Sequence, residues 1–295
     1  ESMSGITTTG STVINNLDYL PKGILIWRAM LQWLGGIGII VLALFILPFL
    51  RVGGMQLFHL EGDDPYEKFL PKISSVISKI VVLYFFLTLL LIVLYFFYGM
   101  DFFDALTHSF TTISTGGFST HDQSLAYFQS SSILLIAIIF MVIGSLPFLV
   151  IAQTSINNIF ATIKDHQVRI FLLILFVSIF IIYLFAEVYI EGNFFQKIIS
   201  ISFNTISIIS GTGYVSENFE SWGNYASVLF LILMFIGGCA GSTTGGLKVF
   251  RFQILFKYLA LHFKKILQPH VVIAGYFNNK IIPESTYESV MSFFF

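Results

Sequence analysis

Long apolar runs alternate with short polar segments along most of the 295-residue chain. At about 1.5 Å per residue, a helix needs roughly 20 apolar residues to cross a hydrocarbon core of about 30 Å. The runs that we predict to span a membrane cover residues 24–50, 80–98, 132–151 and 170–186. Shorter segments at 99–112, 194–209 and 226–236 predict helices that cover only part of that depth.

A small polar loop that carries glycine lies in the middle of the chain, at Ile113-Ser114-Thr115-Gly116-Gly117-Phe118. Its pattern Ile-[Ser/Thr]-x-x-Gly recurs at 6–10 and at 209–213. A spacing of roughly a hundred residues is too wide for a solenoid repeat and suits a membrane module in which a loop dips between two spanning helices. The order span, half-helix, loop, span occurs twice in full, and the first copy lacks its front half. We therefore expect the three loops to meet at one ion-selective constriction.

The composition indicates a protein that crosses the membrane several times. Hydrophobic residues make up 56% of the chain and charged residues 11%, with a mean hydropathy of +0.86. These values are typical of polytopic membrane proteins, so we predict an all-α membrane fold. The single cysteine, Cys239, excludes an intramolecular disulfide and a metal cluster built from cysteines.

The positive charges are distributed unevenly between the connecting segments. Connectors at 51–79, 164–169 and 248–280 hold four, two and six of the 15 lysines and arginines, and the segments that bear the three loops hold the other three. Cytoplasmic connectors are enriched in these residues. The alternation therefore predicts that the three loops face the extracytoplasmic side.

The residue types in these loops predict a site for a cation. Non-helical backbone at membrane depth persists only where it is buried in protein or faces water, so a Ser/Thr/Gly loop is expected to line a polar path. Glycine lets successive carbonyls turn toward one axis, and threonine adds a hydroxyl ligand. The half-helices would direct their partly negative C-terminal ends at the ion. An anion carrier, which is a competing reading, is disfavoured by the acidic residues of these segments: Asp101, Asp104, Asp122, Glu217 and Glu220.

A glycine-rich run at 237–246 interrupts what would otherwise be one long helix through residues 226–267. Gly237 and Gly241 have the spacing of a small-residue packing face, which is one alternative. Consecutive glycines disfavour helix by about 1 kcal/mol each, so a broken helix with a flexible loop is the preferred prediction. Leu247 stands where a phosphate loop requires lysine, which excludes nucleotide binding there. An intramembrane hydrolase that uses Ser242 or a histidine is the remaining alternative, although no histidine partner for Ser242 can be argued from the sequence.

His108 and His121 flank the central loop. Two histidines without a third ligand rarely bind a metal, so we expect His121 to brace the loop or to lie at the outer surface.

Several motifs of the chain resemble the TrkH/KtrB/HKT superfamily of potassium transporters, and the TrkH/TrkG branch most of all. The motifs that carry the resemblance are Thr7-Thr8-Thr9-Gly10-Ser11, Trp33-Leu34-Gly35-Gly36-Ile37-Gly38, Val52-Gly53-Gly54-Met55-Gln56, Ser114-Thr115-Gly116-Gly117-Phe118-Ser119-Thr120-His121 and Gly237-Gly238-Cys239-Ala240-Gly241-Ser242-Thr243-Thr244-Gly245-Gly246-Leu247-Lys248. The resemblance covers essentially the whole chain, and the last run is the most specific of its motifs.

The resemblance implies repeated helix–pore-helix–helix modules, four in the family, around an ion pore on a pseudo-fourfold axis. It implies that potassium is bound by Thr8, Thr9, Gly10, Thr115, Gly116, Gly117, Gly211, Thr212 and Gly213. It implies a gate loop below this filter, formed by Gly237, Gly238, Ala240, Gly241, Ser242, Thr243, Thr244, Gly245 and Gly246. In relatives, glycine rather than serine at the filter positions accompanies a preference for potassium over sodium.

On this alignment the chain divides into parts of a longer protein that has further helices and a fourth filter loop. Residues 1–50 end the first repeat, 51–79 form a cytoplasmic connector, 80–163 form the second repeat, 164–268 the third, and 269–295 a connector and the start of a fourth. We expect no enzyme activity, no cofactor and no nucleic-acid partner, with potassium as the transported ion. The resemblance also implies a homodimer in the bacterial inner membrane that binds a cytosolic nucleotide-binding ring of the TrkA type.

Overall fold

The structure is a computed structural model, and it describes residues 1–45, 69–153, 160–186, 188–190, 192–268, 276–277, 280–282 and 284–294. The α-helices are α1 (Ser2–Ile6), α2 (Lys22–Phe45), α4 (Phe69–Phe97), α5 (Phe102–Ile113), α6 (Ser131–Ser145), α7 (Phe148–Gln153), α8 (Phe160–Lys164), α9 (His166–Ala186), α10 (Phe194–Ile209), α11 (Asn224–Leu233), α12 (Val249–Leu267) and α13 (Glu284–Phe294). Short 3-10 turns lie at Leu17–Tyr19, Ser124–Phe128 and Phe219–Trp222, and β1 (Tyr276–Phe277) pairs antiparallel with β2 (Lys280–Ile281).

Three of the described helices are long and apolar enough to cross a membrane, at Lys22–Leu42, Ser74–Phe97 and His166–Ala186. They lie within α2, α4 and α9 and correspond to three of the predicted spans. Large apolar side chains such as Trp27, Phe86 and Phe176 are exposed on their outward faces. Helices that are apolar all round are typical of membrane spans, whose outer faces meet lipid.

The remaining predicted span, at residues 132–151, is interrupted in the structure. Helix α6 ends at Ser145, Leu146 adopts an extended conformation with φ −85° and ψ 159°, and α7 begins again at Phe148. Pro147 explains the interruption, because a proline ring disfavours helical backbone at the preceding residue. Helix α4 differs in the other direction, since it begins at Phe69, inside the segment that was predicted to be a connector.

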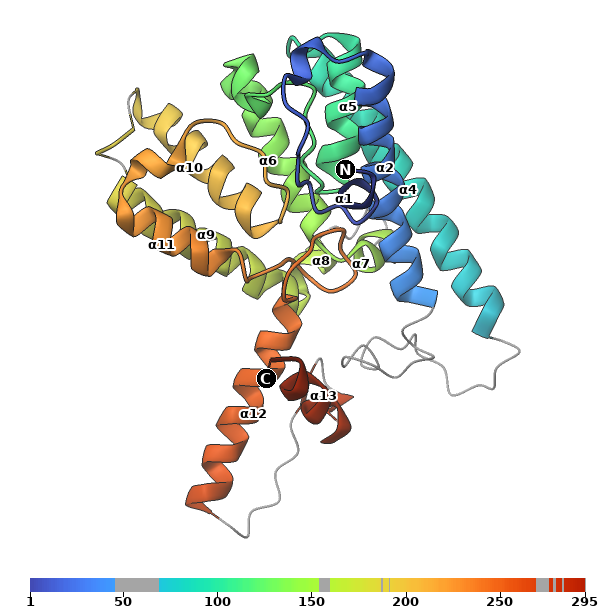
Figure 1. Cartoon of the computed structure of the whole chain (residues 1–295). Coiled ribbons are helices and arrows are strands. Elements are labelled where there is room, and N and C mark those ends of the chain that lie inside the picture. Colours follow the sequence, from blue (N-terminus) through green and yellow to red (C-terminus); the bar gives the residue numbers. More distant parts are fainter. Residues whose placement is uncertain are drawn as a thin grey trace.

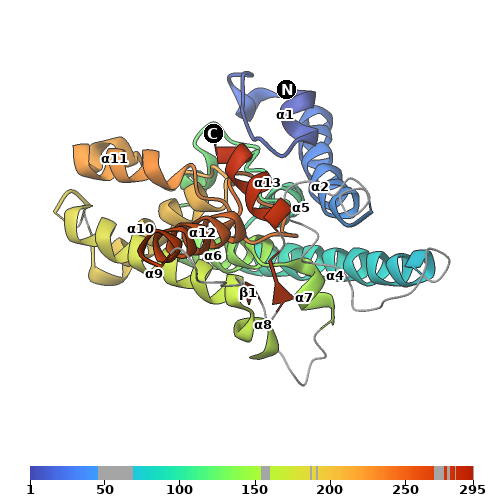
Figure 2. The ribbon, with the colours of Figure 1, turned by 90° about the horizontal axis from the view of Figure 1, so that it is seen from below.

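Helices α5 and α10, which precede two of the loops, are each packed between two other helices. Helix α5 packs against α2 and α4, and α10 packs against α6 and α9 (Figure 1). Seen from below, α4 and α9 extend toward opposite sides of the molecule, with α6 between them (Figure 2). This arrangement brings the C-terminal ends of α5 and α10, and the loops that follow them, to the interior of the helix assembly.

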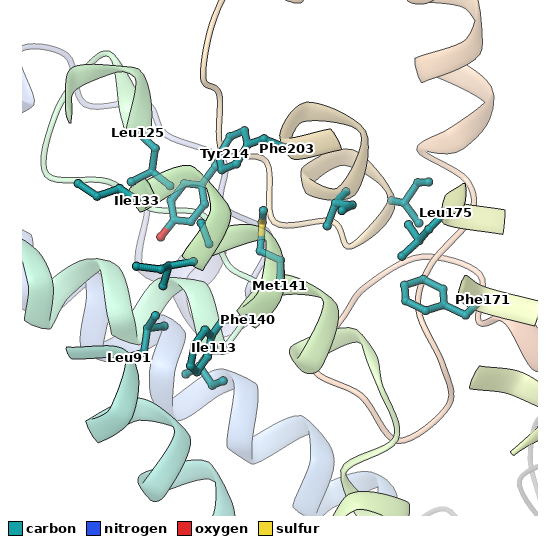
Figure 3. Close-up of a cluster of buried hydrophobic side chains, with 14 of the residues drawn as sticks. Leu91, Ile113, Leu125, Ile133, Phe140, Met141, Phe171, Leu175, Phe203 and Tyr214 are labelled. Atoms are coloured by element: carbon teal, nitrogen blue, oxygen red, sulfur yellow. The ribbon is translucent and has the colours of Figure 1, made fainter. Parts of the chain in front are cut away.

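The buried core joins these two helix groups. Figure 3 shows Tyr214 beside Leu125 and Ile133, with Met141 and Phe140 of α6 near them. All five side chains belong to one buried apolar cluster that also includes residues of α4, α9 and α11. Packing on both faces of α6 therefore holds the loop after α5 and the loop after α10 in fixed relative positions.

The chain is not helical between α11 and α12, where the glycine-rich run lies. Ile236 and Leu247 form a parallel bridge at the base of this segment, and Gly237 N donates to the Leu247 carbonyl at 2.9 Å. Since Gly237 and Gly241 lie outside any helix, the alternative of a helical packing face is wrong. Helix α12 then leaves the assembly and projects downward in Figure 1, with α13 beside it. Phe250, Ile254, Tyr287 and Val290 form a second apolar cluster between these two helices.

Candidate functional site

The three Ser/Thr/Gly loops are loop one at 6–11, loop two at 113–118 and loop three at 209–214, and they share one pattern of backbone angles. In each loop, two residues with positive φ flank one residue with ordinary backbone angles. The first positive-φ positions are Thr8 (54°), Thr115 (51°) and Gly211 (71°). The second are Gly10 (79°), Gly117 (76°) and Gly213 (79°). Non-glycine residues seldom adopt this region, so the strained Thr8 and Thr115 mark places where the surrounding structure imposes the conformation.

Each loop begins at the C-terminal end of a helix: α1, α5 or α10. At the end of α5, Thr115 N donates to the Thr112 carbonyl at 3.0 Å and Gly116 N donates to the Thr111 carbonyl at 2.9 Å. This pair of bonds is the Schellman termination, in which one left-handed residue reverses the chain. Thr8 N and Thr9 N make the same pair of bonds at the end of α1, both at 3.0 Å. The partly negative ends of the helices therefore point at the loops.

The loops touch one another in a regular succession. A Cβ atom added to Gly10 would overlap the carbonyl oxygen of Gly116, and one added to Gly117 would overlap the carbonyl oxygen of Thr212. The same glycine in loop one and in loop two thus rests on the carbonyl of the middle residue in the next loop. Gly213 has no such neighbour within 4 Å in the described part of the chain.

Loop two is held from behind by a side chain of α2. Gln32 is fully buried, its Nε2 donates to the Gly116 carbonyl at 2.7 Å, and its Oε1 accepts from Phe118 N at 3.0 Å. One helical turn earlier, the guanidinium of Arg28 donates to the Ser119 carbonyl at 3.2 Å and lies 4.3 Å from the centre of the Phe118 ring. Two residues on one face of α2 therefore fix residues 116–119.

The other two loops are braced differently. In loop three, the Tyr214 hydroxyl lies 2.5 Å from Thr111 Oγ1 and 3.2 Å from Thr112 Oγ1, so it ties this loop to α5. In loop one, Ser11 stands where the other loops carry an aromatic residue, and its carbonyl accepts from Ser4 Oγ at 3.0 Å. The sequence did not identify Gln32, Arg28, Tyr214 or Ser4 as bracing partners of the loops. The signal for loop two was present, because a polar residue such as Gln32 inside an apolar span usually has a specific partner.

A hydrogen-bonded cluster around His121 joins the segment after loop one to the segment after loop two. The His121 ring hydrogen-bonds through Nδ1 to the Asp18 carboxylate, lies 3.3 Å through Nε2 from Asp104 Oδ2, and stacks on Tyr127 at 3.5 Å between ring centres. Burial opposes the charged imidazolium, but the hydrogen bonds and charges of Asp104 and Asp18 outweigh it and raise the pKa of His121. The His121 side chain therefore links Asp18 to Asp104, and the expectation that it braces the central loop itself stays a prediction.

The glycine-rich segment lies directly against loop two. The Thr243 hydroxyl is 3.1 Å from Thr115 Oγ1 and 3.0 Å from the Gly144 carbonyl. Lys248, at the start of α12, directs its ammonium group back into the segment and donates to Thr244 Oγ1 at 3.1 Å and to the Thr244 carbonyl. The structure thus brings the residues assigned to the filter and those assigned to the gate into contact.

The Ser242 hydroxyl makes its hydrogen bonds within the glycine-rich segment and to Lys248. The hydroxyl donates to the Cys239 carbonyl at 2.6 Å and lies 2.8 Å from Thr244 Oγ1 and 3.4 Å from the Lys248 ammonium. Among the residues that the structure describes, no group of three or more His, Cys, Asp or Glu side chains is placed to hold a metal ion.

Comparison with known proteins assigns the chain to a family. The family model for TrkH, described as a cation transport protein, matches residues 1–295. The chain belongs to the TrkH family. It is 37% identical over 297 residues to the Trk system potassium uptake protein TrkI of Halomonas elongata, with all of this chain and 60% of TrkI covered. It is 40% identical over 303 residues to TrkH of Escherichia coli, with all of this chain and 62% of that protein covered.

The fold agrees with that of a solved TrkH. The crystal structure of the potassium transporter TrkH from Vibrio parahaemolyticus matches with a TM-score of 0.86 and 35% identity, over 99% of this chain and 60% of that chain. The chain thus spans about three fifths of the length of the TrkH relatives it matches. The predicted helical membrane fold and family are confirmed. Because the family consists of transport proteins and not enzymes, the hydrolase alternative is wrong.

Proposed function

We propose that the chain forms the larger part of a potassium pathway, with the three loops as three sides of its selectivity filter. The observation that carries this proposal is the succession in which Gly10 rests on the Gly116 carbonyl and Gly117 on the Thr212 carbonyl. A Cβ atom added to Gly10 would also lie 3.6 Å from the Thr212 carbonyl oxygen, so loops one and three approach each other as well. Loops that meet in this way place backbone carbonyls around a small common space.

Such a space suits a dehydrated cation. Rings of carbonyl oxygens replace the water shell of a potassium ion in known filters, and the ends of α1, α5 and α10 add negative potential. The ligands in this proposal are the carbonyls of the three loops: residues Thr8, Thr9, Gly10, Thr115, Gly116, Gly117, Gly211, Thr212 and Gly213. The potassium uptake described for TrkH and TrkI supports potassium as the ion. Membership in a cation transport family argues against the anion carrier.

The glycine-rich segment 237–246 is proposed as the gate on the same pathway. Its contact with loop two through Thr243 and Thr115 places it next to the filter. The half-buried ammonium of Lys248 hydrogen-bonds to it, and a positive charge beside the path opposes the passage of a cation. The charge distribution supports loops on the extracytoplasmic side. A homodimer in the inner membrane and a cytosolic TrkA-type ring complete the proposal, and they rest on the resemblance.

Binding and transport by the full-length protein test the proposal. The thermal unfolding midpoint of purified protein should rise with potassium and rise less with sodium at equal ionic strength, since a ligand stabilises the state that binds it. Uptake into liposomes should show the same preference. Equal effects of the two ions in both measurements would remove the filter assignment. Shortening the 239–245 segment should increase potassium flux, and unaltered flux would contradict the gate assignment alone.

A further inference from the structure

The side chain of Gln32 occupies the place that a threonine side chain takes in the other two loops. The middle residue is Thr9 in loop one and Thr212 in loop three, but it is Gly116 in loop two. A Cβ atom added to Gly116 would lie 2.5 Å from Gln32 Oε1 and 2.8 Å from Gln32 Nε2. A side chain at position 116 would therefore have to displace the hydrogen-bonded amide of Gln32. Gly116 does not have a positive φ, so its backbone conformation alone does not call for glycine.

The threonines that loop two lacks perform a definite task in their own loops. The Thr9 hydroxyl lies 2.8 Å from Thr7 Oγ1, and the Thr212 hydroxyl lies 2.7 Å from Ser210 Oγ. In both loops the middle residue is thus tied to the residue two positions before it. Loop two cannot form this pair, because Gly116 has no hydroxyl. Ser114 Oγ keeps only its bonds to backbone carbonyls, such as that of Phe110 at 2.8 Å.

Gln32 makes contacts that can replace the missing pair. Its Nε2 donates to the Gly116 carbonyl, and its Oε1 accepts from Phe118 N, so one amide holds both sides of Gly117. Because a carbonyl only accepts and an N–H only donates, these two partners fix the orientation of the amide. The amide is buried and α2 is a long helix packed against α5, so the brace is attached to a rigid element.

We propose that Gln32 is a positioning residue that sets the ion preference of loop two by fixing the Gly116 carbonyl. The inference rests on the proposed potassium pathway. A carbonyl oxygen that accepts a hydrogen bond from a buried amide is held in place and cannot follow a smaller ion inward. The distances between the carbonyl oxygens then stay those that favour potassium over sodium. The loop-two contribution to selectivity therefore depends on a side chain that lies outside the filter motif and comes from the preceding repeat.

The test compares the potassium-to-sodium uptake ratio of full-length variants in liposomes, together with the maximal potassium rate. Gln32→Leu keeps the approximate volume and removes both hydrogen bonds, and the ratio should fall by about tenfold. Gln32→Glu keeps the acceptor for Phe118 N but opposes a carboxylate oxygen to the Gly116 carbonyl, so its ratio should fall as well. Gln123→Leu, an exposed glutamine whose side chain makes no cap hydrogen bond, is the matched control and should retain the wild-type ratio.

A double variant separates this role from a general contribution to stability. Gln32→Ala with Gly116→Thr vacates the space and restores the threonine of loops one and three, with Ser114 as its partner. The uptake ratio of the double variant should be closer to the wild-type value than that of Gln32→Ala. Gly116→Thr alone should have a lowered ratio, because the threonine side chain overlaps the amide of Gln32.

The outcomes distinguish this inference from the function on which it rests. A wild-type protein without potassium preference overturns the pathway itself. A selective wild type with an unchanged ratio in Gln32→Leu overturns only the role of Gln32. If Gln32→Leu does not fold, Gln32→Glu and the double variant decide, and a double variant that folds without recovering the ratio overturns the inference.

Discussion

Replacing Gly117 with alanine inserts a methyl group where the carbonyl oxygen of Thr212 lies. Two costs follow. The positive φ of 76° disfavours any side chain, at about 1–2 kcal/mol for left-handed backbone. The overlap has the larger effect, because the Thr212 carbonyl belongs to another loop and has to move away before the methyl group fits.

The expected loss of selectivity follows from that displaced carbonyl. A hydrogen-bond-like contact between a backbone group and a charge contributes about 1.5–3 kcal/mol. At about 1.4 kcal/mol per factor of ten, loss of one such contact lowers the preference for potassium over sodium by roughly 10- to 100-fold. The measurement is competitive uptake of the two ions by full-length protein in liposomes, normalised to the amount of folded protein.

Gly99→Ala is the control that isolates the contact from the backbone strain. Gly99 has φ 106° in the turn between α4 and α5, and an added Cβ there meets no atom within 4 Å. Gly99→Ala should be destabilised by the left-handed backbone conformation but should keep the wild-type potassium-to-sodium uptake ratio. A folded Gly117→Ala protein with wild-type selectivity would refute the reasoning, and so would an equal loss in Gly99→Ala.

Two further measurements address the residues around the three loops. The pKa of His121 is raised in the folded protein, so its interaction with Asp18 and Asp104 stabilises the fold fully below the ordinary histidine pKa of 6.5. This stabilisation is lost as pH rises through the higher folded-state pKa. The thermal unfolding midpoint should therefore fall over that pH range in the wild type but not in His121→Gln. Thr243→Val removes the buried hydroxyl that contacts Thr115, and at about 1 kcal/mol per hydrogen bond the midpoint should fall by roughly 2–4 °C. Thr243→Ser keeps the hydroxyl and should show no such decrease.

Much of the helical framework was predictable because its physical cause is local. Helices α4 and α9 meet lipid on one side and protein on the other, so nearly every position must be apolar and the runs stand out in the sequence. The interruption at Pro147 also has a local cause, since the ring constrains Leu146 whatever the rest of the fold does. The repeated loop pattern likewise indicated where helices α5 and α10 end.

The contacts within the candidate site could not be predicted in this way. Gln32 was visible as a polar residue in an apolar run, but its partners Gly116 and Phe118 are 84 and 86 residues distant in the sequence. The need for glycine at 116 depends on that same amide. Tyr214 reaches Thr111 across 103 residues, and nothing in its own segment identifies the partner. Such pairings depend on how α2, α5 and α10 pack together, which the order of apolar and polar residues does not specify.

The contact of each loop glycine with the next carbonyl gives the set of loops a direction. One end of the series presents Gly213, which has no carbonyl against it in the described part of the chain, and the other end presents the Thr9 carbonyl, on which no described glycine rests. A further unit of the same kind would therefore fit both ends at once, with its carbonyl against Gly213 and its glycine against Thr9. In an open series, the number of glycine–carbonyl contacts is one fewer than the number of loops. In a closed ring the two numbers are equal. The unit that completes the ring would form two contacts in one step, so closure would be more cooperative than any earlier addition.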